Sequence, residues 1–488
     1  MGALITVLNK SGENAAGTAL KMLRALQPRN AEAYGLATPS ETQIEKTVEA
    51  LENHKLESDT ILGHAFSRIL ETDKPQPLKL ISATLVFEGR LYPARDENSF
   101  DTIAEKLGTR LKGTAANLIK NTEGDFAFAI AEPQQIVAGR DPTGARPLYY
   151  GESASFVALA SERKALWKIG ITKTESFPPG HTALLNKHGF TFEPVKTLKR
   201  PRPAKTTLAH AAERIQTLLQ KSVANRVENA KDVAIAFSGG LDSSLIAALA
   251  KNAGANVHLI HVSLKRQEET RHAQKVAEEM NLPIHAYLYD EQDVKNVLPK
   301  VLRAIEETDP VKVAIGVPFF WAAQETAKMG LRVVLAGQGA DELFGGYKRY
   351  ADTYLAFGKE TAEKNIFNDV ATNYKSNLER DSKICSFHGT ELRLPFTSYQ
   401  LTEYALRIPL ELNIERGVDS LRKLVLRKTA ENLDLPSSVV YRPKKAIQYA
   451  TGVSKVLRKL ARESRLNLKE YLMQCFRATT VETGEVGR

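Results

Sequence analysis

Short apolar runs separated by turn residues dominate the first part of the chain, up to about residue 195. The runs at 3–8 (ALITVL), 126–131 (FAFAIA) and 156–160 (FVALA) are examples, and each predicts a buried or half-buried strand. Stretches over 16–26 and 105–119 have helical spacing and lie between some of these runs. This mixture predicts an α+β domain.

After a segment rich in Pro, Lys and Arg at about 195–207, which predicts a linker, the pattern changes. Strands and helices now alternate: a helix is expected over 208–227, strands over 233–237, 257–262, 284–289 and 332–336, and helices within 238–252, 270–280 and 319–329. Such alternation predicts a parallel sheet with helices on both faces. From about residue 350 the pattern is mostly helical. We therefore expect two domains, at 1–195 and 208–475.

Composition restricts the class of protein. The chain has 488 residues, of which 43% are hydrophobic, so it can build more than one sizeable core. No apolar run is long enough for a membrane span, and the first 15 residues lack the basic region and long apolar core of a secretory signal. The two cysteines, Cys385 and Cys475, are too few for a disulfide framework or a metal cluster. We expect a cytoplasmic protein with no membrane partner.

The net charge of +10, with a pI near 9.2, suits either nucleic acid or an anionic small substrate such as ATP. No run of five or six like charges occurs, and the densest basic patch, at 199–203, is more typical of a solvated linker than of a nucleic-acid-binding arm. We therefore expect no nucleic-acid partner.

The segment 238–244 (SGGLDSS) directly follows a predicted strand and opens a predicted helix. Unpaired backbone N–H groups and the positive end of the helix dipole make such a turn an anion site. Gly239 and Gly240 permit close approach of an oxyanion, while Ser238, Ser243 and Ser244 supply hydroxyl groups. Asp242 suits a phosphate site only if it holds a metal ion. An ordinary capped turn is the alternative, but it accounts less well for three serines and an Asp.

A second glycine-rich loop, Gly337-Gln338-Gly339-Ala340-Asp341-Glu342, follows the predicted strand at 332–336. Both loops leave the carboxyl ends of strands, where ligands bind in open α/β sheets. We expect Asp341 to face Asp242 across the phosphates, so that the two carboxylates hold Mg²⁺.

These motifs carry a family resemblance over about residues 210–460. SGGLDSS resembles the pyrophosphate loop of ATP pyrophosphatase domains, and residues 337–347 resemble the G-[ED]-G-x-D-E-x-F-G-G-Y segment of asparagine synthetases. Glu391 to Phe396 is similar to that family's E-x-R-x-P-F, Lys423 and Arg427 to its K-x3-R helix, and Arg442 to Lys444 to the R-x-K segment whose lysine contacts pyrophosphate. The resemblance implies an α/β parallel-sheet domain of the adenine nucleotide alpha hydrolase type with a helical C-terminal region.

The resemblance also implies site residues. The expected ATP contacts are Ser238, Gly239, Gly240, Asp242, Ser243, Ser244, Val262, Gly337 and Asp341, with Asp242 and Asp341 as the metal ligands. The expected catalytic residues are Glu391, Lys444, Gln338 and Glu342. The family usually has an acid where this chain has Gln338, and Gln cannot accept a proton from ammonia. Glu391 is therefore the first candidate for that role and Glu342 the second.

Residues 1–190 resemble a class II glutamine amidotransferase domain, which implies an N-terminal-nucleophile-type αββα sandwich. The matching segments are 85–92, 123–129, 138–151, 161–166 and 179–181. That chemistry needs an N-terminal Cys, whereas this chain begins Met1-Gly2-Ala3, and Glu88 stands where the family has an amide. We expect a front domain without glutaminase activity; a wrongly assigned start is the competing explanation.

Together the resemblances imply an asparagine-synthetase-like ligase. It would use ATP and Mg²⁺ to adenylate a carboxylate, aspartate by default, and transfer ammonia to it with release of AMP and pyrophosphate. The alternatives are an amide ligase that uses an organic amine, as β-lactam synthetases do, a catalytically silent nucleotide-binding regulatory protein, and a tRNA-modifying enzyme of the pyrophosphatase-loop class. The expected partners are small molecules, and a homodimer is an option.

Overall fold

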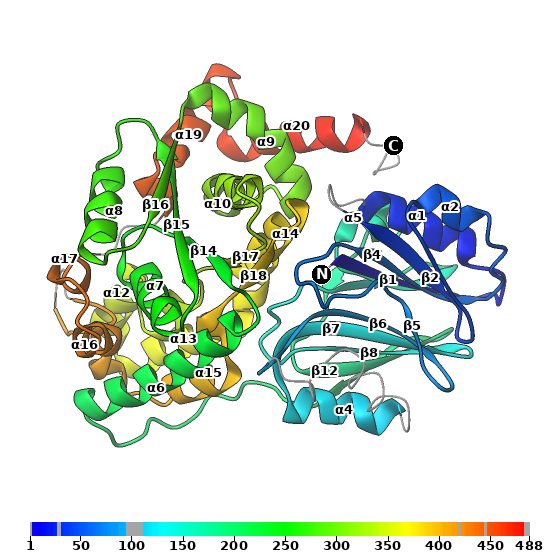
Figure 1. Cartoon of the computed structure of the whole chain (residues 1–488), viewed down its shortest axis with the longest axis horizontal. Coiled ribbons are helices and arrows are strands. Elements are labelled where there is room, and N and C mark those ends of the chain that lie inside the picture. The colour runs from blue at the N-terminus through cyan, green and yellow to red at the C-terminus, as the bar shows by residue number, and fades with distance from the viewer. Residues whose placement is uncertain (1, 27–30, 94–110, 418–420, 444–446, 483–488) are drawn as a thin grey trace.

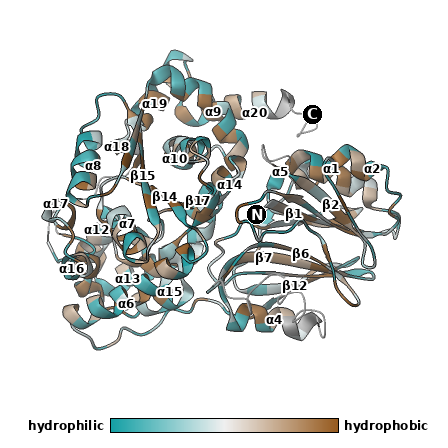
Figure 2. Ribbon diagram, in the orientation of Figure 1, coloured by the Kyte–Doolittle hydropathy of each residue, from teal (hydrophilic) through white to brown (hydrophobic). Residues whose placement is uncertain are grey.

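A computed structural model describes residues 2–26, 31–93, 111–417, 421–443 and 447–482. Figure 1 shows two bodies side by side: the N-terminal part, in blue and cyan, and the remainder, in green to red. The hydrophobic positions in Figure 2 lie along the strands and on the inward sides of the helices. Of the helices that the structure describes, none is long and apolar enough to cross a membrane.

The front domain contains two antiparallel sheets. The first has the order β11-β9-β10-β1-β4-β2-β3, with β1 at Gly2–Asn9, β2 at Ala33–Ala37, β3 at Thr42–Glu45, β4 at Thr60–Phe66, β9 at Tyr149–Glu152, β10 at Phe156–Ala160 and β11 at Glu175–Ser176. The second has the order β13-β12-β8-β7-β6-β5, with β5 at Leu78–Lys79, β6 at Thr84–Tyr92, β7 at Glu123–Glu132, β8 at Gln135–Arg140, β12 at His181–Asn186 and β13 at Gly189–Pro194. The described helices are α1 (Ala16–Leu26), α2 (Val48–Glu52), α4 (Leu111–Asn121) and α5 (Arg163–Trp167).

Three apolar layers hold this domain together. Leu4, Leu62 and Val86 belong to the core between the two sheets. A second core lies between the first sheet and α1, α2 and α5, and a third lies between the second sheet and α4. The front domain is therefore an αββα sandwich, as the resemblance of residues 1–190 implies.

The second domain begins at α6, after a segment without helix or strand from residue 195 to residue 207. Its sheet is wholly parallel, in the order β16-β15-β14-β17-β18, with β14 at Asp232–Ala236, β15 at Asn256–Leu264, β16 at Ile284–Tyr289, β17 at Val333–Leu335 and β18 at Glu391–Arg393. One apolar core contains residues of α6 (Leu208–Val227), α7 (Leu241–Asn252) and α8 (Glu268–Glu279). The other contains residues of α9 (Glu291–Ile305), α10 (Pro310–Lys328) and α14 (Glu379–Phe387). Helices thus cover both faces of the sheet.

The rest of this domain is helical, as expected. Its α-helices are α11 (Ala340–Leu343), α12 (Lys348–Phe357), α13 (Lys359–Asn373), α15 (Tyr399–Ala405), α16 (Leu424–Asn432), α17 (Ser437–Val440), α18 (Ile447–Ala450), α19 (Val453–Glu463) and α20 (Leu468–Glu482). A π-helical turn, η2 (Tyr374–Leu378), joins α13 to α14, and short 3-10 turns occur at η3 (Pro395–Thr397) and η4 (Leu410–Leu412).

Two helices differ from the expectation. The structure adds α9, whose start is fixed by a reciprocal cap between Asp290 and Asp293. Helix α10 begins at Pro310 rather than near residue 319, because Asp309 caps it and Pro310 fits the first turn. Pro318 lies inside this helix, one residue before the start that the sequence indicated.

Buried polar contacts join the two domains. Glu306, at the end of α9, accepts hydrogen bonds from the backbone N–H groups of Arg163 (3.0 Å) and Lys164 (2.9 Å) at the start of α5. Glu379, at the start of α14, accepts from Arg140 NH1 (3.1 Å), Tyr149 Oη (2.9 Å) and Ser176 Oγ (3.0 Å). Helix α14 is therefore anchored to the front domain at its first residue.

Candidate active site

The first glycine-rich loop connects β14 to α7. Gly239 has φ +69°, and a Cβ at this position would lie 2.9 Å from the Cα of Ala273, so the loop needs glycine there. Ser238 Oγ accepts from the Gly240 N–H at 3.2 Å, and Ser243 Oγ donates to the Gly240 carbonyl at 3.2 Å. These two hydroxyls shape the turn. No side chain of the described residues caps α7, so the N–H groups of its first turn are available to an anion.

The second loop approaches the first closely. Strands β14 and β17 are neighbours, with Ala234 opposite Val334, so both loops leave the same edge of the sheet. A Cβ on Gly337 would lie 2.8 Å from the Cβ of Asp242. Because only a glycine allows this approach, the sequence specifies the contact between the two loops.

Asp242 and Asp341, the two expected metal ligands, converge on one cation, which here is a lysine ammonium. Lys423 Nζ lies 2.7 and 2.6 Å from the two carboxylate oxygens of Asp242 and 2.6 Å from Asp341 Oδ1. The lysine is buried, and this burial lowers its pKa although the carboxylates oppose the shift. Sequence reasoning noted Lys423 in a motif but assigned it no role.

The positions of Asp242 and Asp341 also bear on whether a Mg²⁺ ion would fit between the two loops. Carboxylate oxygens are the ligands this ion prefers, and two carboxylates close enough to share one ammonium can also share a divalent cation. Within the described ranges, no group of three or more His, Cys, Asp or Glu side chains forms a metal site. Two carboxylates suit Mg²⁺, which takes its remaining ligands from water and phosphate.

Glu342, beside Asp341 on α11, is buried and faces two donors. Tyr347 Oη donates to Glu342 Oε1 at 2.6 Å, and Asn377 Nδ2 donates to the same oxygen at 3.0 Å. Burial raises the pKa of Glu342, and the hydrogen bond from Tyr347 opposes the shift only in part. A carboxylate with a raised pKa is a better proton acceptor than an ordinary one.

Glu391 occupies a different place from the one its predicted role requires. It lies at the amino end of β18, opposite Val333, whereas the two loops leave the carboxyl ends of the strands. Arg393 Nε donates to its Oε1 at 2.6 Å, and Arg90 Nε, from the front domain, donates to its Oε2 at 2.9 Å. Arg146 NH2 is 4.0 Å away.

These contacts decide the charge of Glu391. Burial alone would raise its pKa, but the three arginines outweigh burial and hold the pKa well below the usual range. Such a carboxylate stays ionised and is a poor proton acceptor. We therefore revise its role from proton acceptor to a component of the domain boundary.

The other predicted residues have various surroundings. Val262 lies in β15 and packs into the core shared with α9 and α10. The Ser244 hydroxyl is buried at the start of α7, without a hydrogen-bond partner among the described residues. Lys444 lies outside the described residues. The segment before it is held by Arg427, which donates to the carbonyls of Val440 and Arg442.

In the front domain, the position of the expected nucleophile has no room for a side chain. Gly2 lies in β1 opposite Phe66, and a Cβ there would come within 1.8 Å of the Ala65 carbonyl oxygen. Glu88 is buried and accepts from Ser161 Oγ at 2.6 Å. Burial raises the pKa of Glu88 to about 7.

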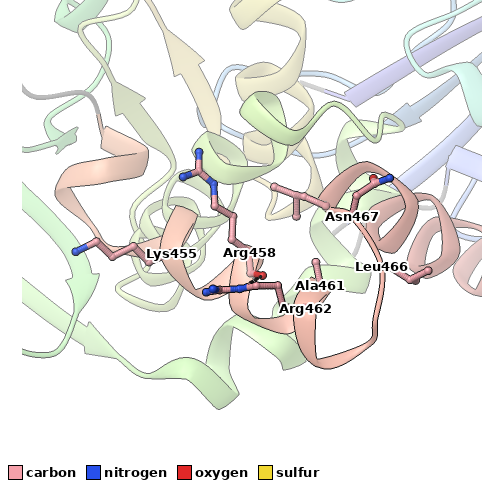
Figure 3. A pocket seen from close by; sticks show the side chains of 7 residues that line it. Lys455, Arg458, Ala461, Arg462, Leu466 and Asn467 are labelled. Carbon is pink, nitrogen blue, oxygen red and sulfur yellow. Dashed lines mark hydrogen bonds between the residues drawn. The ribbon is translucent and has the colours of Figure 1, made fainter.

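A hollow of about 570 Å³ lies apart from these loops, between α19 and α20 (Figure 3). Its lining includes Lys455, Arg458 and Arg462 on α19 and Asn467 before α20, and none of the predicted site residues. The candidate site is therefore defined by the two loops and not by this hollow.

Two family models match different parts of this chain. A family model described as asparagine synthase matches residues 214–364 and 356–483, and a model described as a glutamine amidotransferase domain matches residues 67–168. A Methanocaldococcus jannaschii protein that carries the name asparagine synthetase (glutamine-hydrolyzing) 1 is 34% identical over 405 residues, which cover 72% of this chain and 74% of that protein. A Dictyostelium discoideum protein named as an asparagine synthetase is 26% identical over 440 residues, or 81% of this chain and 78% of that protein. Among solved structures, a glutamine phosphoribosylpyrophosphate amidotransferase from B. subtilis covers 58% of this chain and 65% of its own at 18% identity, with a TM-score of 0.35, which is too low to carry an argument.

Proposed function

The chain belongs to the asparagine synthetase family, and on that premise we propose that it is an ATP-dependent carbon–nitrogen ligase that adenylates a carboxylate and joins an amine to it. Aspartate is the carboxylate by default, and AMP and pyrophosphate are the other products. The observation that carries this proposal is the convergence of Asp242 and Asp341 on one cation, from two loops at the same edge of a parallel sheet.

In the first step, a carboxylate oxygen of the substrate attacks the α-phosphorus of ATP. A P–O bond forms, the bond to the leaving pyrophosphate breaks, and an acyl-adenylate results. The N–H groups at the start of α7 and the hydroxyls of the loop would hold phosphate oxygens, and Lys444 would stabilise the charge on the pyrophosphate. Mg²⁺, held by Asp242 and Asp341, would neutralise phosphate charge when bound.

In the second step, the nitrogen lone pair of the amine attacks the acyl carbon, and the C–O bond to AMP breaks. The surplus proton on nitrogen must pass to a base. Among the predicted carboxylates, Glu342 suits this role better than Glu391, because burial raises its pKa whereas three arginines lower that of Glu391.

The nitrogen source is proposed to be free ammonia or another amine. The two relatives compared above carry glutamine-hydrolyzing names, but here a side chain at residue 2 would collide with the backbone of β4. The same observation leaves an organic amine, as in β-lactam synthetases, as the second candidate. We propose that the domain at 1–195 covers and supports the synthetase domain at 208–475 instead of hydrolysing glutamine.

Exchange of labelled pyrophosphate into ATP tests the first step directly. The assay runs with Mg²⁺ and a panel of amino-acid and other carboxylates, and without any acid as the blank. We expect exchange that requires an acid, with aspartate giving the highest rate. Binding of ATP without exchange for any acid would instead support a regulatory nucleotide-binding protein. A cytoplasmic location and a homodimer stay predictions, and light scattering of the purified protein tests the second.

A further inference from the structure

Gln338 stands beside the nucleotide loop. It lies between Gly337, whose backbone contacts Asp242, and Gly339, whose φ of +94° turns the chain into α11. The side chain of Gln338 is partly exposed, whereas its neighbours Ala336 and Ala340 are buried. Gln338 is therefore placed to meet a ligand that reaches the edge of the sheet between the two loops.

A buried carboxylate fixes the orientation of this side chain. Gln338 Nε2 donates to Asp381 Oδ2 at 2.7 Å, across 43 residues of sequence. Because an ionised carboxylate only accepts hydrogen bonds, it must face the amide nitrogen of Gln338 and not its oxygen. The Gln338 carbonyl oxygen is left as an acceptor, and no side chain in the described part of the chain donates to it.

Asp381 is itself held firmly. Arg380 donates to both of its oxygens, from Nε at 2.7 Å and from NH2 at 2.8 Å, and the carboxylate is fully buried. Arg380 NH1 also donates to Asn377 Oδ1 at 3.1 Å. Asn377 in turn donates to Glu342, so the contact at Gln338 and the carboxylate of Glu342 belong to one network.

The helix that carries Asp381 is fixed to the front domain at two points. Glu379 receives three side-chain hydrogen bonds from that domain, as described above. Lys383 Nζ donates to Glu306 Oε2 at 3.0 Å, and Glu306 caps α5 of the front domain. Asp381 lies between these two anchors, so its position depends on the boundary between the domains.

We propose that Asp381 is a positioning residue that fixes the side-chain amide of Gln338, so that the Gln338 carbonyl oxygen accepts a hydrogen bond from the attacking amine. The assignment rests on the proposed function, because it concerns the amine step of that reaction. The Gln338 carbonyl carries no full negative charge, and the charge of Asp381 is balanced by Arg380. The amine subsite formed in this way favours an uncharged amine, which is also the species with a free lone pair.

The experiment measures both half-reactions in the full chain. Gln338→Leu removes both the N–H donor and the carbonyl acceptor of the side-chain amide. Asp381→Asn weakens the contact that fixes the orientation of the Gln338 amide. We expect each variant to raise KM for ammonia about tenfold, the effect of losing one hydrogen bond, while acid-dependent pyrophosphate exchange changes less than twofold. Ser382→Ala is the matched control, because Ser382 is the buried neighbour of Asp381 on α14 and its hydroxyl has no partner among the described residues. Ser382→Ala should change neither the KM for ammonia nor the rate of pyrophosphate exchange.

A pH profile separates positioning from a merely structural role. Gln338→Glu places a second carboxylate against Asp381, and two adjacent carboxylates cannot both ionise easily. We expect this variant to add an ionisation to the pH profile of the amine step. We expect the further change Asp381→Asn to move that ionisation back towards the ordinary range of a carboxyl, because the new side chain then no longer faces a second carboxylate.

The outcomes distinguish this assignment from the proposed function. If the wild-type chain exchanges pyrophosphate but KM for ammonia stays within twofold in Gln338→Leu, the assignment is overturned and the ligase proposal stands. An equal loss in exchange and in the amine step would also overturn it, because the effect would then be structural. If the wild-type chain catalyses pyrophosphate exchange with none of the acids in the panel, the proposed function fails and this assignment fails with it.

Discussion

Arg90 and Glu391 form an ion pair across the boundary between the two domains, with Arg90 Nε 2.9 Å from Oε2 of the fully buried Glu391. Arg90 also donates to Asp73, so its removal takes a cation from two carboxylates at once, of which Glu391 keeps Arg393. We expect Arg90→Met to lower the free energy of unfolding by about 3 kcal/mol. Urea unfolding followed by tryptophan fluorescence checks this, since Trp167 and Trp321 report on one domain each.

The control for Arg90 is Lys459→Met, which breaks an exposed pair with Glu291 and should leave the free energy of unfolding almost unchanged. The stability that the ionised Glu391 contributes depends on pH, and the depressed pKa of this carboxyl fixes the direction of that dependence. Its contribution to stability is present above the unfolded pKa of about 4.3 and is lost as the pH falls below that value. Equal losses of unfolding free energy in Arg90→Met and Lys459→Met would contradict a stabilising contact between Arg90 and the buried Glu391.

Glu88 has the opposite pH dependence. Its folded pKa of about 7 lies above the unfolded value, so the folded state loses stability as the pH rises from about 4.3 to 7, and the penalty is complete above 7. The full penalty is about 4 kcal/mol. We expect Glu88→Gln, which can still accept from Ser161, to raise Tm at pH 8 and to change it little at pH 4.5.

Glu152→Gln, at an exposed position of the same domain, is the control and should leave Tm unchanged at both pH values. An equal rise in Tm for Glu88→Gln at pH 4.5 and pH 8 would show that the carboxyl does not titrate as described.

Much of the fold could be predicted because its signals are local. The alternation of apolar strands and amphipathic helices identified the parallel sheet, and the glycines at 239 and 337 marked the two loops that meet at its edge. Strand β18 has three residues, too few to show any period, so Glu391 could not be placed at the amino end of a strand.

The contacts within the candidate site were less accessible from sequence. Arg90 precedes Glu391 by 301 residues, and Gln338 precedes Asp381 by 43. No periodic pattern connects residues so far apart, because their contact depends on how the domains and helices pack. The role predicted for Glu391 relied on its motif alone, and the arginines around it gave that carboxylate a different environment.

The nucleotide site gives a direct prediction. Asp242→Asn and Asp341→Asn should each lower ATP–pyrophosphate exchange at least about a hundredfold, since each removes one of two carboxylates that would hold Mg²⁺ against the phosphates. Circular dichroism should show an unchanged fold. Asp352→Asn, which alters an exposed pair with Lys348, is the control. A wild-type exchange rate in either site variant would rule out the two-carboxylate metal site.

Lys444 should act on the leaving pyrophosphate. The charge that builds on this group in the transition state is stabilised by a nearby cation, a role worth several kcal/mol in a closed site. We expect Lys444→Ala to lower kcat far more than it weakens ATP binding. Lys445→Ala is the matched control in the same basic stretch. Equal small effects in the two variants would mean that Lys444 is an ordinary solvated lysine.

The most direct test of the account follows oxygen and nitrogen together in one reaction. The wild-type chain is incubated with ATP, Mg²⁺ and aspartate labelled with ¹⁸O in its side-chain carboxylate, with either ammonium or glutamine as nitrogen source, and the products are read by mass spectrometry. With ammonium we predict asparagine and AMP that carries one ¹⁸O atom, because the carboxylate oxygen leaves on the phosphate. With glutamine we predict neither asparagine nor glutamate. Unlabelled AMP with ammonium, or asparagine and glutamate formed from glutamine, would contradict the account.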